Sequence, residues 1–280
     1  GTNCGISGTY AFLVSKVPSL EPSSVLSEIP SLAPSQSIAP TLSPLPTQAP
    51  SSSAMPTPFV LLLPFGEEVG DITTPPTLDG SSIRFLLPIP MIFFGESITQ
   101  GYQNANGHLS FDSDYSKYVS TVLPLQLEPP LVAVYWADTD TRSGGSDWNK
   151  LYARNSTDWS DLDRAASVVR AATGGDFEPT AAFVATWYWV MKTGGSSSSL
   201  YTFQVVLAFD EQQTWAILGY NELDYFSSSA SSSVIGFNDR DAMYGFTVKE
   251  IDSVSDMEVL VEGTNCGISG TYAFLVSKVP

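Results

Sequence analysis

The sequence predicts a mainly β protein: an antiparallel β-sandwich with one inserted helix, together with an extended linker rich in serine and proline. Three observations lead to this prediction. Short aromatic and β-branched runs, broken by Gly, Pro, Asn, Asp and Ser, recur from Phe59 to about Val276 and are typical of strands. One stretch, over about residues 160–173, has the apolar spacing of a helix. Residues 19–58 are dominated by Pro, Ser and Thr.

Both ends of the chain carry the same eighteen residues, GTNCGISGTYAFLVSKVP, at Gly1–Pro18 and at Gly263–Pro280. Chance does not produce such a match, so we interpret it as a repeat with a period of 262 residues, the offset between positions 1 and 263. Residues 1–18 are then the closing strand of a preceding repeat. The chain begins with Gly rather than Met, and we interpret it as a piece of a longer protein. The alternative is donor-strand exchange, in which this strand completes the next domain.

The predicted linker, residues 19–58, contains 9 Pro, 11 Ser and 3 Thr in 40 residues. Proline disfavours helix interiors and central strands, and it favours polyproline II, which would extend this segment to about 120 Å at ~3.1 Å per residue. This composition is typical of an O-glycosylated stalk. The candidate acceptors are Ser23, Ser24, Ser31, Ser35, Ser37, Thr41, Ser43, Thr47, Ser51, Ser52, Ser53 and Thr57. Interspersed aliphatic residues leave two alternatives open, a free spacer or a segment lying along the globular units.

Residues 59–280 form the predicted globular domain. Its clearest strands are Leu131–Asp138, Ala181–Val190, Tyr201–Phe209 and Thr214–Tyr220, and the last two read as a hairpin joined by Asp-Glu-Gln-Gln. Within this hairpin, Tyr201, Phe203, Val205 and Leu207 alternate with Thr202 and Gln204, which predicts that one face is buried.

The predicted helix begins with Ser160 as its N-cap, with Asp163 three residues later, and ends at Gly174-Gly175. The terminal strand, within residues 263–280, follows a glycine-rich turn and places Tyr272, Phe274 and Val276 on one face. The predicted contacts between repeats are Cys4, Tyr10, Phe12, Cys266, Tyr272 and Phe274.

The formal charge of −17 excludes nucleic-acid binding and association with anionic membrane surfaces, because both require cationic surfaces. It suits an extracellular surface or one that attracts divalent cations. No apolar run approaches the ~18 residues that span a bilayer. The repeat contains one cysteine, so no disulfide can form within it. That cysteine is either a buried thiol or a link between repeats.

No catalytic constellation is recognisable, and no cofactor is expected. The single histidine, His108, follows an Asn-Gly turn signal at the start of a predicted strand, which favours a structural or surface role. Asp138 and Asp140 are calcium candidates because carboxylate oxygens suit that ion, the alternative being Asp–Arg pairing with Arg142. Asn155, in the sequon Asn-Ser-Thr, is a candidate N-glycosylation site in a predicted polar loop before the helix.

Several segments, taken in order, resemble the nidogen-like (NIDO) domain. They are LLPFGEEVGD from Leu62, PIPMIFFGE from Pro88, QNANGHLSF from Gln103, LVAVYWADTDTR from Leu131, AAFVATW from Ala181, YTFQVVLAFDEQQTWAILGY from Tyr201, IGFNDRDAMYGFTV from Ile235, and GTNCGISGTYAFLV. The resemblance covers roughly Leu61 to Val276 and implies an extracellular, non-enzymatic module of matrix and adhesive proteins. Such a domain usually occurs once, whereas the repeat predicts that another copy follows here through a Ser/Pro stalk, which favours a fibre.

The leading functional hypothesis is a structural repeat of an extracellular glycoprotein filament, with domains and linkers in tandem. Its partners are neighbouring repeats, head to tail, and covalent glycans. The alternative is a cell-surface adhesion module that binds glycan or protein through exposed aromatics such as Trp148, Trp159 and Tyr225.

Overall fold

The computed structural model describes residues 62–73, 83–142, 148–195, 200–223 and 232–278. The predicted linker, the N-terminal copy of the repeated segment with Cys4, Tyr10 and Phe12, and the candidate Tyr225 lie outside these residues. Neither helix within the described ranges has the length and apolarity needed to cross a membrane.

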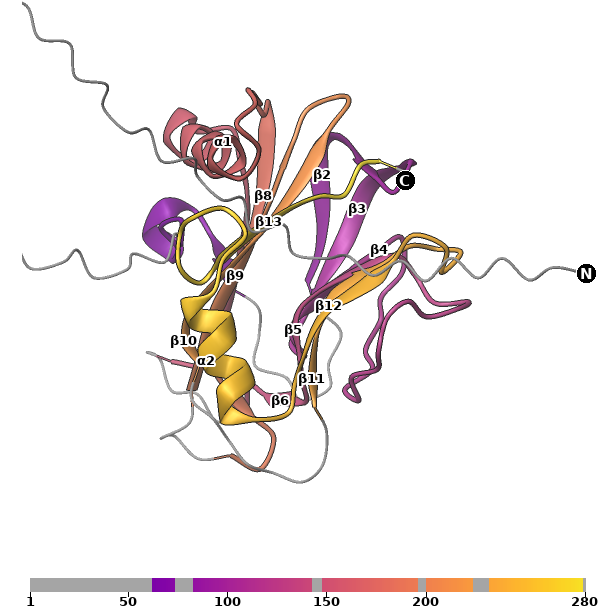
Figure 1. Ribbon diagram of the computed structural model, residues 1–280, viewed down its shortest axis with the longest axis vertical. Helices are drawn as coiled ribbons and strands as arrows, with labels where there is room; N and C mark the ends of the chain where they lie inside the picture. Colours follow the sequence, from indigo (N-terminus) through magenta and orange to yellow (C-terminus); the bar gives the residue numbers. More distant parts are fainter. Residues whose placement is uncertain (1–61, 74–82, 143–147, 196–199, 224–231, 279–280) are drawn as a thin grey trace, which may run out of the picture. The chain divides into compact units, whose positions relative to one another are not determined.

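Two antiparallel sheets face each other, as the sequence predicted (Figure 1). The first sheet runs in the order β1 (Ile72–Thr73), β7 (Lys150–Ser156), β8 (Ala181–Lys192), β9 (Leu200–Phe209), β10 (Thr214–Leu223) and β13 (Thr271–Leu275), and β6 (Thr139–Asp140) pairs with β8. The second runs β12 (Phe246–Ile251), β11 (Ser233–Asn238), β5 (Leu131–Trp136), β4 (His108–Phe111), β3 (Glu96–Asn104) and β2 (Ile83–Phe93). The predicted β9–β10 hairpin is confirmed.

Helix α1 (Trp159–Thr173) occupies the predicted place but has a different N-cap. The carboxylate of Asp158, not the hydroxyl of Ser160, caps the helix by accepting the Ser160 N–H at 2.8 Å. An acidic cap satisfies a free N–H and also complements the positive end of the helix dipole. The predicted end is confirmed, since Gly174 takes the left-handed conformation that closes the helix.

A second helix, α2 (Val254–Glu262), was not predicted, so the expectation of one helix is wrong. The side chain of Ser253 caps it by accepting the Asp256 N–H. Met257 and Leu260 point into the core, and α2 contacts both β10 and β12. The helix therefore closes one open side of the sandwich, between β10 of the first sheet and β12 of the second (Figure 1).

The described part of the domain contains three apolar cores. The central core lies between the sheets and contains fully buried aromatics such as Phe183, Trp187 and Phe203. The second, which we call the outer core, lies on the other face of the first sheet, where α1 covers Val184 and Val206. The third gathers Tyr115, Leu123 and Trp136 against the outer face of the second sheet.

The outer core buries the second face of β9 as well. The alternation predicted one buried face, but Thr202 and Gln204, on the opposite face, are also only 2% and 1% exposed. Their face is covered because α1 and residues 62–73 form another layer on that side of the first sheet (Figure 1). Polar residues in a strand interior thus become available for buried hydrogen bonds.

Candidate functional site: the two junctions of the domain

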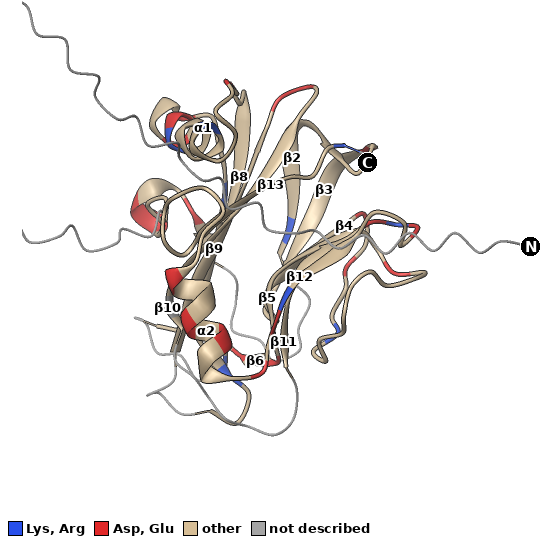
Figure 2. Ribbon diagram, viewed as in Figure 1, with Lys and Arg blue, Asp and Glu red and all other residues tan. Residues whose placement is uncertain are grey.

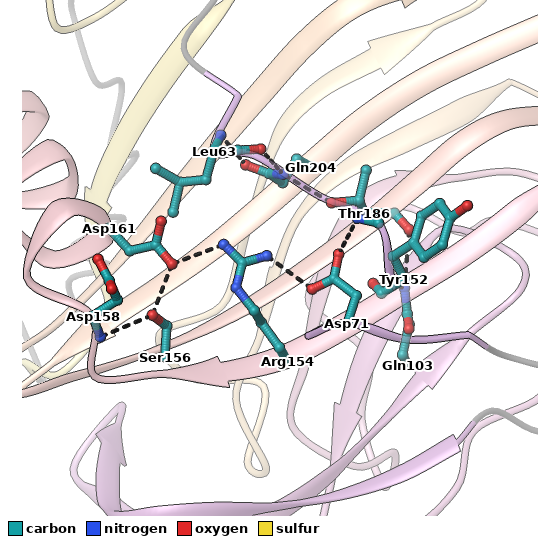
Figure 3. Close-up of polar contacts among 11 residues, drawn as sticks. Leu63, Asp71, Gln103, Tyr152, Arg154, Ser156, Asp158, Asp161, Thr186 and Gln204 are labelled. Atoms are coloured by element: carbon teal, nitrogen blue, oxygen red, sulfur yellow. Dashed lines mark hydrogen bonds and ion pairs between the residues drawn. The ribbon is translucent and has the colours of Figure 1, made fainter. Parts of the chain in front are cut away.

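A buried polar network attaches residues 62–73, which we call the anchor segment, to the outer face of the first sheet (Figure 3). This segment is where the chain joins the domain after the predicted linker. Among the described residues, no group of three or more His, Cys, Asp or Glu side chains could hold a metal ion.

Gln204, near the middle of β9, forms hydrogen bonds with both backbone groups of Leu63, at the start of the anchor segment. Its carboxamide oxygen accepts the Leu63 N–H at 2.8 Å, and its Nε2 donates to the Leu63 carbonyl at 3.1 Å. Nε2 also donates to the Thr186 hydroxyl at 2.8 Å, which fixes the orientation of the amide. The Gln204 carboxamide thus pairs with the Leu63 backbone as a neighbouring strand would. This pairing matters because a buried backbone group without a hydrogen bond is costly.

Arg154, from β7, lies between two buried carboxylates (Figure 3). One guanidinium nitrogen is 2.8 Å from Asp71 of the anchor segment, and another is 2.8 Å from Asp161 in the first turn of α1. Burial works against the charged guanidinium, but the two carboxylates outweigh it and keep the pKa of Arg154 above its usual value. The arginine therefore joins the anchor segment, the sheet and the helix through fixed charges.

The anchor segment is shaped by a tight turn that aims Asp71 at Arg154. Gly66 and Gly70 have φ angles of 116° and 86°, a region that favours glycine, and the short 3₁₀ helix Glu67–Val69 lies between them. The second oxygen of Asp71 accepts the Gly66 N–H at 2.7 Å and closes the turn. The stretch GEEVGD thus encodes both the turn and the charged group that fastens it.

Chemically, this arrangement holds the anchor segment in position on the first sheet. The Asp161 oxygen that accepts from Arg154 also accepts a hydrogen bond from the Ser156 hydroxyl at 2.7 Å, so this oxygen has two donors. Buried ion pairs are not intrinsically more stabilising than a packed apolar cluster, but breaking one leaves an uncompensated charge. The network therefore selects one placement of the anchor segment and penalises its detachment.

The second junction is formed by residues 263–278, which we call the closing segment. Its strand, β13, lies at the end of the first sheet and pairs with β10 from Gly219–Thr271 to Trp215–Leu275. Beyond the strand, the carbonyls of Val276 and Ser277 accept the N–H groups of Phe94 and Gly95. The closing segment is thus bonded to the first sheet and to the β2–β3 turn of the second.

The free edge of β13 is covered from within the closing segment. Asn265 accepts the Ala273 N–H at 2.8 Å and donates to the Ala273 carbonyl at 2.9 Å. The Thr264 hydroxyl donates to the Thr271 carbonyl at 2.8 Å. Because edge strands can recruit other strands, this internal pairing protects the edge.

The predicted contact residues of this segment are built into the cores. Tyr272 and Phe274 pack against the central core together with Val276, as the strand pattern predicted. Burial, with a smaller contribution from nearby Cys266, raises the pKa of Tyr272 to about 12, and its hydroxyl donates to the Val259 and Leu260 carbonyls of α2. Cys266 lies in the outer core at 4% exposure, so a link through this thiol requires the segment to open.

The calcium candidates are engaged in other interactions. Asp140 makes the anticipated pair with Arg142: the Arg142 Nε and terminal nitrogen lie 3.1 and 3.0 Å from its two oxygens. These hydrogen bonds lower the pKa of Asp140 despite its partial burial. Asp138 accepts the Thr193 hydroxyl at 2.7 Å. The structure thus contains the Asp140–Arg142 pair, and calcium binding stays a prediction.

Asn155 lies in β7, not in a polar loop as predicted, because the strand continues to Ser156 before the chain turns into α1. Its side chain is exposed, and its Nδ2 donates to the Leu86 carbonyl at 2.8 Å. Of the aromatics considered for adhesion, Trp159 is 76% exposed and Trp148 is partly buried.

His108 begins strand β4, as predicted, and is fully buried. One ring nitrogen, Nε2, lies 2.7 Å from the Tyr115 carbonyl. Burial lowers the pKa of His108 to about 4, which keeps the ring neutral near pH 7. The structural interpretation holds, and the surface alternative does not.

Sequence reasoning missed the residues that fasten the anchor segment: Asp71, Arg154, Asp161 and Gln204. The available signals were an arginine within a strand and a glutamine among large apolar residues. Neither signal identifies a partner, since Arg154 and Asp71 are 83 positions apart in the sequence.

Comparison with known proteins gives a consistent result. The model of the nidogen-like domain matches residues 99–278. Nidogen of Drosophila melanogaster is 30% identical over 75% of this chain and 16% of its own length. Alpha-tectorin of Mus musculus is 30% identical over 78% of this chain and 10% of its own length, and the corresponding values for mouse nidogen-2 are 32%, 78% and 17%.

The chain thus spans less than a fifth of the length of these curated relatives. No solved structure matches it significantly. Because the matched region covers most of the described sandwich, including β4 to β13 and the closing segment, the resemblance found in the sequence is confirmed. This chain belongs to the family of nidogen-like domains and is an extracellular structural module.

Proposed function

We propose that this chain is one repeat of an extracellular glycoprotein filament, in which domains alternate with Ser/Pro-rich linkers at a period of 262 residues. The observation that carries this proposal is the repeated eighteen-residue segment. Its C-terminal copy is an integral part of the sandwich, since it supplies the end strand of the first sheet and side chains to two cores. The same sequence at the N-terminal end is therefore best explained as the end of another such domain.

A tandem array follows from this assignment. Identical repeats make identical contacts with their neighbours, and head-to-tail contacts that do not close produce a linear or helical fibre. The anchor and closing segments are the points through which tension would enter and leave each domain. The proposed role is structural rather than enzymatic, with neighbouring repeats and covalent glycans as partners.

Surface charge is compatible with this role. In Figure 2, the acidic positions are spread over the 3₁₀ helix, α2 and several loops, whereas basic positions in the described part are few and scattered. Together with the net charge of −17, this distribution favours solvation and mutual spacing of domains over binding to polyanions.

The first test is the sequence on either side of this chain, read from the gene or from overlapping peptides. The proposal expects Asp-Met-Glu-Val-Leu-Val-Glu, the residues that precede Gly263, to precede Gly1 as well. Electron microscopy should then show domains at regular spacing along a fibre. A different preceding sequence, with no fibre, would contradict the tandem array.

An adhesion role is the second candidate, favoured by the 76% exposure of Trp159 at the start of α1. Large exposed aromatics are common at binding surfaces. Binding of the single domain to a glycan array, lost in Trp159→Ala and retained in Trp148→Ala, would support this candidate. Absence of binding would leave the structural role as the better explanation.

A further inference from the structure

The edge of β10 forms a receiving site for a strand, and the chain contains two sequences able to fill it. We propose that residues Gly1–Pro18 of a second copy of this chain can occupy the place of the closing segment and join the two copies through a shared strand. This inference deepens the proposed filament function and rests on its self-association. It concerns how the domain edge is filled, and not whether repeats are covalently continuous.

The receiving site lies entirely outside the closing segment. It consists of β10, the Phe94 and Gly95 N–H groups, and the Val259 and Leu260 carbonyls of α2. Most of these contacts involve backbone groups of the site, which any strand of suitable sequence can satisfy. Specificity comes from the apolar side chains of the strand, which enter the central core on one face and the outer core on the other.

The proposed occupant is identical in sequence to the segment that fills this site. Residues 1–18 are identical to residues 263–280, so Tyr10 and Phe12 correspond to Tyr272 and Phe274. The occupant also includes the brace that protects its outer edge, because Asn3 and Ala11 correspond to the bonded pair Asn265 and Ala273. Each copy thus contains the complete sequence of the closing segment, and we call such a stretch a closing unit.

Within these 280 residues the closing unit occurs twice and the receiving site once, so the site can meet either copy. A unit from another chain would make the same hydrogen bonds and apolar packing in the site as the resident unit that it replaces. Exchange between chains is therefore governed by protein concentration rather than by a difference in interaction energy. A donor end that engages a distant receiving edge is a head-to-tail contact, which builds open chains of molecules.

A disulfide can report this exchange. Ile217 lies opposite Ala273, whose own N–H and C=O bond to Asn265 and not to β10. Such pairs have Cα atoms about 4.5 Å apart, within the range that a disulfide can bridge. Both side chains lie in the outer core. The corresponding residue of the N-terminal copy is Ala11.

The experiment uses the full chain with Cys4→Ala and Cys266→Ala as background, carrying Ala11→Cys and Ile217→Cys. It is unfolded, refolded at a low and at a tenfold higher concentration, and oxidised mildly. The expected result is a ladder of linked chains on non-reducing gels, with the 11–217 disulfide identified by peptide mass. The linked fraction should increase severalfold at the higher concentration.

Two matched variants control for folding and register. Ala273→Cys with Ile217→Cys should give a monomeric disulfide, which shows that the background folds and that the site accepts the link. Leu13→Cys with Ile217→Cys is displaced by two residues along the same face and should link severalfold less.

If only monomers form in Ala11→Cys with Ile217→Cys, with or without an internal disulfide, the proposal is overturned. That result would leave the tandem array intact, since the array depends on the flanking sequence and on the fibre image. A ladder without the expected flanking sequence would instead favour assembly of separate subunits.

Discussion

Arg154 connects three parts of the domain that are distant in sequence: the anchor segment, β7 and the first turn of α1. Its side chain is 7% exposed, and its two carboxylate partners are 1% and 8% exposed. Water cannot take over from a lost partner at such depth. The stability of the anchor segment should therefore respond strongly to changes at this residue.

Arg154→Met keeps much of the side-chain length but leaves two buried carboxylates without their cation. We expect the free energy of unfolding to fall by about 3–5 kcal/mol, measured by urea denaturation. Limited proteolysis should also cut the anchor segment faster, because its fastening to β7 is lost.

Arg170→Met is the matched control for this substitution. Arg170 forms a 3.6 Å pair with Asp176, and both side chains are more than half exposed. Its loss should cost less than about 1 kcal/mol. Equal losses in the two variants would show that the buried network does not fasten the segment.

The buried His108 makes the stability of the folded domain depend on pH. Its folded pKa of about 4 is below the usual 6.5, because burial disfavours the charged ring. The unfolded chain therefore binds more protons between these values. The resulting stability is fully present above pH 6.5 and is lost as the pH falls through about 4.

We expect this effect to remove up to about 3 kcal/mol of unfolding free energy between pH 7 and pH 4, since one pKa unit corresponds to ~1.4 kcal/mol. Denaturation curves of the wild type and His108→Gln across this range provide the measurement, and their difference isolates the histidine from carboxylates that titrate nearby. Parallel curves for the two proteins would contradict the assignment.

At the scale of elements, the sequence predicted those whose patterns are local and long. The β9–β10 hairpin and α1 were found because apolar periodicity and turn residues occur within each segment. α2 was missed because it has only nine residues, several of them β-branched, and follows a strand almost directly. Its signal was Ser253 followed three residues later by Asp256, a pattern that also occurs in turns.

The burial of Gln204 could not be predicted for a different reason. Alternation along β9 shows which face lies against the central core, but not whether another layer covers the opposite face. That layer comes from α1 and from Leu63, which is 141 positions away from Gln204. The anchor segment, which depends on such distant pairings, was consequently the least predictable part of the domain.

The closing segment depends on Asn265, whose amide pairs with both backbone groups of Ala273. Asn265→Ala should lower the free energy of unfolding by about 1–3 kcal/mol, because one backbone residue of β13 loses both partners. It should also increase self-association, since the edge becomes open to other strands. Thermal unfolding and light scattering measure the two effects.

The chain contains its own control for this prediction. Asn3→Ala makes the same change in the N-terminal copy of the segment. As long as the C-terminal copy fills the site, Asn3→Ala should leave the unfolding midpoint unchanged. A similar loss in both variants would mean that the two copies share the site.

For the whole molecule, the relation between domain and linker determines what kind of fibre can form. The domain has fixed junctions at both ends, so changes in spacing must arise between residues 19 and 58, outside the described part. Proline favours an extended backbone, and the scattered aliphatic side chains of the linker offer little apolar area to offset the ordering of forty residues. We therefore expect the linker to remain extended rather than to lie on the domain.

Shortening the linker in a chain of two repeats tests this expectation. Deleting residues 31–50 removes 20 residues, which at ~3.1 Å each should bring the two domains closer by up to about 60 Å. The distance between domain centres can be measured on single molecules by electron microscopy. A linker that follows the domain surface would set the spacing by domain size, so an unchanged distance would favour docking.

Replacing residues 31–50 by an equally long Gly/Ser sequence should also shorten the mean distance, because a flexible chain is more compact than polyproline II of equal length. The shortening should be smaller than that caused by the deletion.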